Sequence, residues 1–160
     1  MNKRFPIIFF LALIFITGCG KAESPPPPAL SDSLPPNIGS VELTETITGE
    51  AAAEMSTRLH QRRLRNAKEM AIGSYGTDIS VWLSEYATAK EARSETDRMV
   101  KAMQRIGGDF GSVRVIKLAG RTAYVVAPGG QTQYFWSRGK ILVYVIAGGA
   151  TEQEVEAAFP

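Results

Sequence analysis

The sequence contains only one cysteine, Cys19, and one histidine, His60. A single cysteine cannot form a disulfide within the chain, and structural zinc sites take their ligands from several cysteines and histidines. His60 lies in RLHQRR, where neighbouring positive charges oppose metal binding and no suitably spaced carboxylate suggests a catalytic triad. The sequence therefore predicts no disulfide, no metal ion and no histidine-based catalysis.

Glycine-containing motifs typical of enzymes are also missing, since the chain has no GxSxG, Walker A or GxGxxG sequence. Gly73–Gly76 reads as a bulge or a turn rather than a phosphate loop. Asp78 and Glu85 are separated by an expected strand, and Ser137 with Lys140 flanks a turn as many surface pairs do. We therefore expect a protein that is not an enzyme and binds no cofactor.

Long apolar runs are scarce. The longest, Phe5–Ile16, is broken only by Pro6 and is too short for a membrane helix, which needs about 20 residues. Lys3 and Arg4 precede the run and small residues follow it. This arrangement predicts a secretory signal peptide over residues 1–18.

The residues Ile16-Thr17-Gly18-Cys19 resemble a bacterial lipobox. The resemblance implies that the signal peptide is removed before Cys19, whose thiol receives a diacylglyceryl group and whose new amino group is acylated by a fatty acid such as palmitate. Cys19 is then a membrane anchor, because each buried methylene contributes about 0.8 kcal/mol. Gly20-Lys21, without Asp after the cysteine, imply the periplasmic face of the outer membrane if the organism has two membranes.

Residues 19–40 are expected to be a lipidated, Pro-rich tether, since Pro25–Pro28 and Pro35-Pro36 favour extended polyproline II. The remaining residues, 41–160, suffice for one globular domain. The chain has 18 Lys and Arg against 16 Asp and Glu. Removal of the signal peptide takes two basic residues with it and leaves the charges balanced, so nucleic acid is not an expected partner of this exported domain.

Hydrophobic periodicity predicts an α+β fold with a single antiparallel sheet. The sheet is expected to hold a four-strand C-terminal meander and one or two earlier strands, with one long helix on a face and short N- and C-terminal helices. The expected elements are a helix from Gly49 to about Arg63, strands at Met70–Tyr75 and Ile79–Ser84, a long helix from the capping box Thr88–Glu91 to Gly107-Gly108, strands at Val113–Leu118, Thr122–Ala127, Gln131–Trp136 and Lys140–Ile146, and a helix after the capping box Thr151–Glu154.

The turns of the meander predict its register. With Ala119-Gly120, Pro128–Gly130 and Arg138-Gly139 as complete turns, one apolar face carries Val115 and Tyr134 and lies under the long helix. The opposite face mixes polar and aromatic side chains and is a candidate binding face, because such residues are favoured at interfaces. The residues of this candidate binding face are Arg114, Gln133, Phe135 and Tyr144.

Two alternatives remain for this face: the first helix or a second copy of the chain covers it, and a one-residue slip of register exchanges the faces. If the assignment is right, replacing Gln133 and Tyr144 by Ala weakens binding without unfolding the domain. Loss of folding would instead show that the face is core.

No acidic residue occurs between Asp109 and Glu152. The first and third turns of a meander lie at the same end, so we expect a basic end that meets anionic lipid, an anionic polymer or an acidic partner. Its candidate residues are Lys117, Arg121, Arg138 and Lys140. The alternative is that these are solvated charges that discourage edge-to-edge aggregation.

A strand containing Trp136, the turn Arg138-Gly139, the segment Tyr144–Gly148 and the helix start Thr151–Glu154 resemble closing elements of extracytoplasmic sensor and adaptor domains. The resemblance assigns no functional residue. From the predicted anchor and the mixed sheet face we expect a lipid-anchored envelope protein that acts by binding, as an accessory or adaptor subunit that contacts another envelope protein through that face. The alternative is a binder of a small ligand or an anionic envelope polymer. No residue pattern supports a hydrolase.

Overall fold

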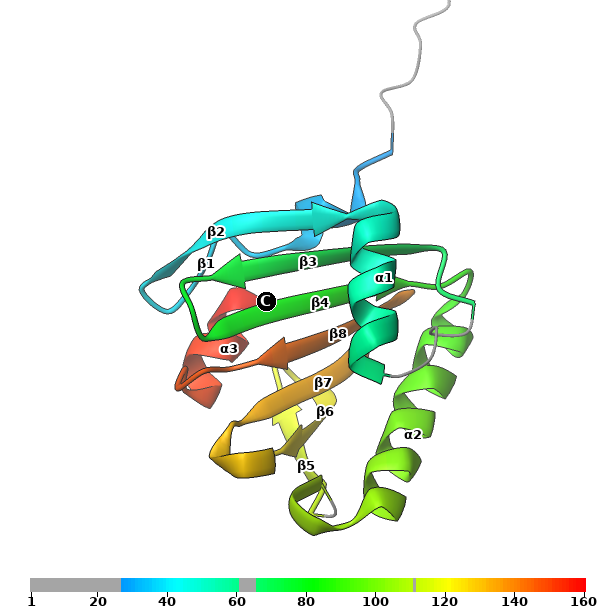
Figure 1. Cartoon of the computed structure of the whole chain (residues 1–160), viewed down its shortest axis with the longest axis vertical. Coiled ribbons are helices and arrows are strands. Elements are labelled where there is room, and N and C mark those ends of the chain that lie inside the picture. Colours follow the sequence, from blue (N-terminus) through cyan, green and yellow to red (C-terminus); the bar gives the residue numbers. More distant parts are fainter. Residues whose placement is uncertain (1–26, 61–65, 111) are drawn as a thin grey trace, which may run out of the picture.

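A computed structural model describes residues 27–60, 66–110 and 112–160 of the chain. The strands within these ranges form one sheet and are β1 (Asn37–Ile38), β2 (Val41–Thr48), β3 (Glu69–Tyr75), β4 (Ile79–Glu85), β5 (Arg114–Leu118), β6 (Arg121–Val126), β7 (Gln133–Arg138) and β8 (Ile141–Ile146). Their spatial order is β1-β2-β3-β4-β8-β7-β6-β5, and every neighbouring pair is antiparallel (Figure 1).

Helices cover both faces of this sheet. On the front face, α1 (Gly49–His60) contacts β2 and β3, and α2 (Ala89–Ile106) contacts β7 and β8. α3 (Glu152–Ala158) and the 3-10 turn η1 (Leu30–Ser33) lie on the back face, and Figure 1 shows α1 in front of the strands and α3 behind them. The α+β class, the single antiparallel sheet and the long helix are as the sequence predicts. β1 and β2 are additional to the one or two early strands expected.

The folded domain begins before residue 41. Leu30, Leu34 and Ile38 are buried in the core behind the sheet, and the Tyr75 hydroxyl donates a hydrogen bond of 2.7 Å to the main-chain oxygen of Pro35. The predicted tether over residues 19–40 is thus corrected at its C-terminal side. The prediction followed the Pro-rich composition of this segment and gave no weight to its apolar residues, Leu30, Leu34 and Ile38, which cover the back of the sheet.

The two predicted capping boxes are confirmed. The Thr88 hydroxyl oxygen accepts a hydrogen bond of 3.2 Å from the Glu91 N–H, while the Glu91 carboxylate accepts one of 3.1 Å from the Thr88 N–H. Thr151 and Glu154 make the same exchange at the start of α3. Gly107 follows α2 with a φ of +69°, which glycine adopts without steric cost. These helix ends are set by local hydrogen bonds, which explains why the sequence predicts them.

The meander follows the predicted register on one side only. β5 pairs with β6 as expected around Ala119-Gly120. Between β6 and β7, however, Val126 pairs with Gln133, because the 3-10 turn η3 (Pro128–Gly130) lies inside a connection longer than the three-residue turn predicted. The pairing of β6 with β7 is shifted by one residue. Side chains of β7 and β8 that the prediction placed on the same face as a given side chain of β5 or β6 therefore lie on the opposite face from it. At the last turn Arg138 pairs with Ile141, which shifts β8 by two residues and preserves its faces.

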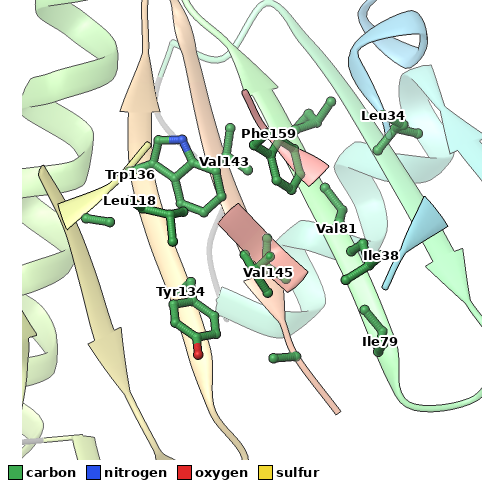
Figure 2. Packing of buried hydrophobic residues seen from close by; sticks show 14 of the residues in the cluster. Leu34, Ile38, Ile79, Val81, Leu118, Tyr134, Trp136, Val143, Val145 and Phe159 are labelled. Atoms are coloured by element: carbon green, nitrogen blue, oxygen red, sulfur yellow. The ribbon is translucent and has the colours of Figure 1, made fainter. Parts of the chain in front are cut away.

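The resulting cores lie on the two sides of the sheet. Behind it, Trp136 meets Phe159 edge to face with their ring centroids 5.1 Å apart, and Figure 2 shows Val143 and Val81 near the Phe159 ring. In front of it, Phe135 packs between two tyrosines under α2. The long helix therefore covers the face of β7 and β8 that the sequence assigned to binding.

Candidate functional site

Most of the predicted binding face is core. Phe135 is 0%, Gln133 7% and Tyr144 8% exposed, all on the front face beneath α2. The Tyr144 hydroxyl donates a hydrogen bond to Gln133 Oε1, and burial raises the pKa of Tyr144 to about 12. These side chains contact the interior of the domain, so the predicted binding face is wrong for them. The physical reason is the one-residue shift between β6 and β7.

Arg114 does not join the other three residues. It pairs with Val125 on β5 and β6 and is exposed on the back side, where Val125 is buried. Burial raises the pKa of Tyr134, and the negative charge of Glu152 raises it further. The positive charge of Arg114 lowers it, so Arg114 lies close enough to Tyr134 to interact with it electrostatically. Arg114 therefore belongs to a different surface from Gln133 and Tyr144.

The predicted basic end is divided. Arg121 uses its guanidinium to bind the main-chain oxygens of Phe159 and Pro160 at 2.9 and 3.0 Å. Lys117 donates a hydrogen bond of 3.1 Å to the Thr122 hydroxyl on the front side. Arg138 shares a small pocket with Phe159 behind the sheet.

Lys140, the fourth residue of the basic end, is exposed in the β7–β8 turn, and its main-chain oxygen accepts a hydrogen bond from the Tyr86 N–H. Only Arg121 and Arg138 thus lie beside the same residue, Phe159. The alternation of side chains along each strand separates the others, so the four do not form one continuous patch.

A different surface is left uncovered by the helices. Ile106, the last residue of α2, is 71% exposed, and Val115 on β5 is 65% exposed. Val115 pairs with Tyr124 on the front face. We call this surface the open corner; it consists of Ile106, Phe110, Val113, Val115 and Tyr124, of which Phe110, Val113 and Tyr124 are partly buried against the front core.

The open corner exists because α2 is longer than the strands it covers. Met99 and Met103 of its apolar stripe are buried, whereas Ile106 on the same stripe lies beyond them. β5 is the last strand of the sheet, and Figure 1 shows it at the lower end of the molecule near the end of α2. One side of its backbone therefore has no neighbouring strand among the described residues, which is the condition for adding a strand from another chain.

The open corner is absent from the sequence-based expectations, because the predicted register places Val115 on the apolar face beneath the long helix. The prediction that α2 covers Val115 is wrong. A clue was present in the sequence: Gly107-Gly108 ends the helix directly after Ile106, before the chain turns into β5.

The last turns of α2, next to the open corner, carry exposed basic side chains. Lys101 and Arg105 are exposed there, and the exposed acid Asp97 lies about one turn before Lys101. Arg105 directly precedes Ile106. A partner at the open corner would therefore meet a positive potential together with apolar side chains, which favours an acidic partner.

Cys19 and the side chain of His60 lie outside what the structure describes, as do the predicted signal peptide and the expected end of α1 at Arg63. Within the described ranges, none of the helices has both the length and the apolar character needed to cross a membrane. The same ranges contain no cluster of His, Cys, Asp and Glu side chains that could hold a metal ion. Comparison of the chain with protein-family models, curated proteins and solved structures gives no match.

Proposed function

We propose that the protein is a lipid-anchored accessory subunit of the bacterial envelope and that its open corner binds an extended, acidic segment of another envelope protein. The observation that carries this proposal is the exposure of two apolar side chains: Val115, 65% exposed on the edge strand β5, and Ile106, 71% exposed at the end of α2. The anchor is Cys19, in the lipobox-like sequence near the start of the chain.

The proposed contact adds a strand to β5. Main-chain groups on the free side of β5 pair with the incoming segment, and alternate side chains of that segment reach the front face. There they pack beside Val115, and this contact removes apolar surface from water, which contributes about 25 cal/mol per Å². The back side of β5 presents Arg114, so an acidic residue at the next position of the segment would face a cation.

The alternative, an anionic polymer at the basic end, has less support. Arg121 is already bound to main-chain oxygens and Lys117 to Thr122, and the basic residues lie on different sides of the sheet. A polymer contact would weaken strongly in high salt, whereas contact through Val115 and Ile106 would largely persist. Measuring partner capture over a salt series separates the two.

The test uses the full-length lipidated protein in membranes of its own host. We expect Val115→Asp and Ile106→Asp each to weaken capture of the partner at least about tenfold, since each places an anion in the apolar contact and opposes an acidic partner. Both side chains are exposed, so neither variant should change the unfolding midpoint appreciably.

Met55→Asp is the matched control. Met55 is the other large apolar side chain with substantial exposure among the described residues, at 38%, and it lies on α1, away from β5. The Met55 variant should capture the partner as well as the wild type does. Equal capture by wild type and the Val115 variant, or selective loss in the Met55 variant, would contradict the proposed surface.

The anchor is tested separately by comparing wild type with Cys19→Ala. Mass spectrometry of the wild type should show an acylated N-terminal peptide beginning at Cys19, and the protein should fractionate with membranes. The variant should lose the modification. An unmodified Cys19 in the wild type would refute the lipid anchor while leaving the open corner to be judged by its own test.

A further inference from the structure

A second site lies behind the sheet, on the side opposite to the open corner. It is a pocket of about 150 Å³ between η1, the strands β4, β7 and β8, and the residue that follows α3. Its lining consists of Ser33, Leu83, Arg138, Ile141, Val143 and Phe159.

The inner wall of the pocket is apolar and held in place. Leu83, Val143 and Phe159 are each at most 2% exposed, and Figure 2 shows Val143 beside the Phe159 ring. Phe159 is fixed twice: its ring packs against Trp136, and its main-chain oxygen accepts a hydrogen bond of 2.9 Å from Arg121. A ligand entering this pocket therefore contacts a preformed apolar surface, and binding does not have to pay the entropy of fixing these side chains.

The mouth of the pocket is polar and positive. Arg138 and Ser33 are exposed there, and no ion pair joins Arg138 to an acid among the residues that the structure describes. A guanidinium presents several donors in one plane, which matches the two oxygens of a carboxylate. The pocket thus combines an apolar wall with a cation available at its opening.

We propose that this pocket binds an anionic amphiphile, with a short acyl chain against Val143 and Phe159 and its anionic group at Arg138. A free fatty acid and an anionic phospholipid share this chemistry. The proposal does not depend on the open corner, because the two sites lie on opposite faces of the sheet and use different residues.

The test uses a chain of residues 20–160, which retains every described element of the sheet and both of its cores and needs no detergent. Its folding is checked by circular dichroism. Binding of butyrate, hexanoate, octanoate and decanoate is then measured by calorimetry, below their micelle concentrations. We expect the affinity to rise about fourfold for each added methylene, and to stop rising once the chain fills the pocket.

The role of Arg138 is tested with Arg138→Gln. This variant should bind octanoate about tenfold more weakly and bind neutral 1-octanol as the wild type does, because only the anionic group is recognised by the guanidinium. Lys140→Gln is the matched control, since Lys140 is an exposed base of the same turn that does not line the pocket. It should leave octanoate binding unchanged.

Vesicles distinguish the two sources of the amphiphile. Binding to phosphatidylcholine vesicles containing phosphatidylglycerol that octanoate displaces, and that Arg138→Gln weakens, would assign the pocket to a membrane lipid. Octanoate binding without vesicle binding would assign it to a free acid, and both results support the proposal. Absence of octanoate binding at millimolar concentration, or equal losses in the Arg138 and Lys140 variants, would overturn it.

Discussion

Tyr144 and Gln133 form a buried polar pair whose energetics test whether the front face of β7 and β8 is core. The Tyr144 hydroxyl donates to Gln133 Oε1, and both side chains are less than a tenth exposed. Tyr144→Phe leaves the Gln133 oxygen without its donor, and Gln133→Leu leaves the hydroxyl without its acceptor. Each single variant should lose about 1–3 kcal/mol of unfolding free energy, the usual cost of an unpaired buried polar group.

The double variant should be more stable than the sum of the single losses implies. When Tyr144→Phe and Gln133→Leu are combined, neither partner remains to be left unpaired, and apolar groups of similar shape fill the same space. We expect the unfolding free energy of the double variant to be at least about 1 kcal/mol higher than the value calculated by adding the two single losses. A coupling of this size is within the range found for residues in direct contact.

Urea unfolding of residues 20–160, followed by tryptophan fluorescence, measures these free energies. Tyr124→Phe is the control, because Tyr124 is on the same face but only partly buried and its hydroxyl makes no hydrogen bond recorded in the described residues; it should cost less than about 0.5 kcal/mol. If both single variants at Tyr144 and Gln133 unfold like the wild type, the pair is open to water. The register between β6 and β7 described here would then be wrong.

Further variants and conditions probe the turns and the buried tyrosines. Ala119 has a φ of +47°, so Ala119→Asn should stabilise the domain by about 1 kcal/mol in urea unfolding, and a loss of stability would contradict this turn. Gly148→Ala should cost more than about 2 kcal/mol in the same assay, because an added Cβ would overlap the Asp78 carbonyl oxygen and φ is +49°. Burial raises the pKa of Tyr86 and Tyr144 from the ordinary 10.0 to about 12, so their contribution to stability is complete below pH 10 and is lost as the pH rises toward 12. Thermal melting at about pH 9 and about pH 11 measures this loss, and unchanged melting would contradict their burial.

The elements of the fold could be predicted because their determinants are local. The capping boxes at Thr88 and Thr151 fix two helix starts within four residues of sequence. Alternation of apolar residues identifies β4 and the strands of the meander. β2 was not predicted, although Val41, Leu43 and Ile47 alternate with polar residues. Glu45 interrupts the apolar side and none of the strand's residues is fully buried, so its pairing with β3 defines it.

The assignment of side chains to faces could not be made in the same way, because it depends on the number of residues in one connection. Val126 and Gln133 are paired across a segment whose 3-10 turn contains Gly129 at a φ of +58°. The sequence shows Pro and Gly in this connection, but it does not show whether the number of residues between the paired ends of β6 and β7 is odd or even. A difference of one residue decides whether Gln133 and Phe135 face solvent or α2.

The open corner shows the same limit for a helix. The apolar stripe of α2 continues to Ile106 in the sequence without interruption, so periodicity alone predicts that Ile106 is buried. Whether it is buried depends on how far the sheet extends beneath the helix, and that extent is set by β5 and β6, which follow later in the chain. Ile106 and Val115 are therefore exposed for one reason: α2 packs on β7 and β8 and leaves both its own last residue and the last strand, β5, uncovered. An exposed apolar surface formed in this way has no sequence motif, and it is found only when the helix and the strand are placed together.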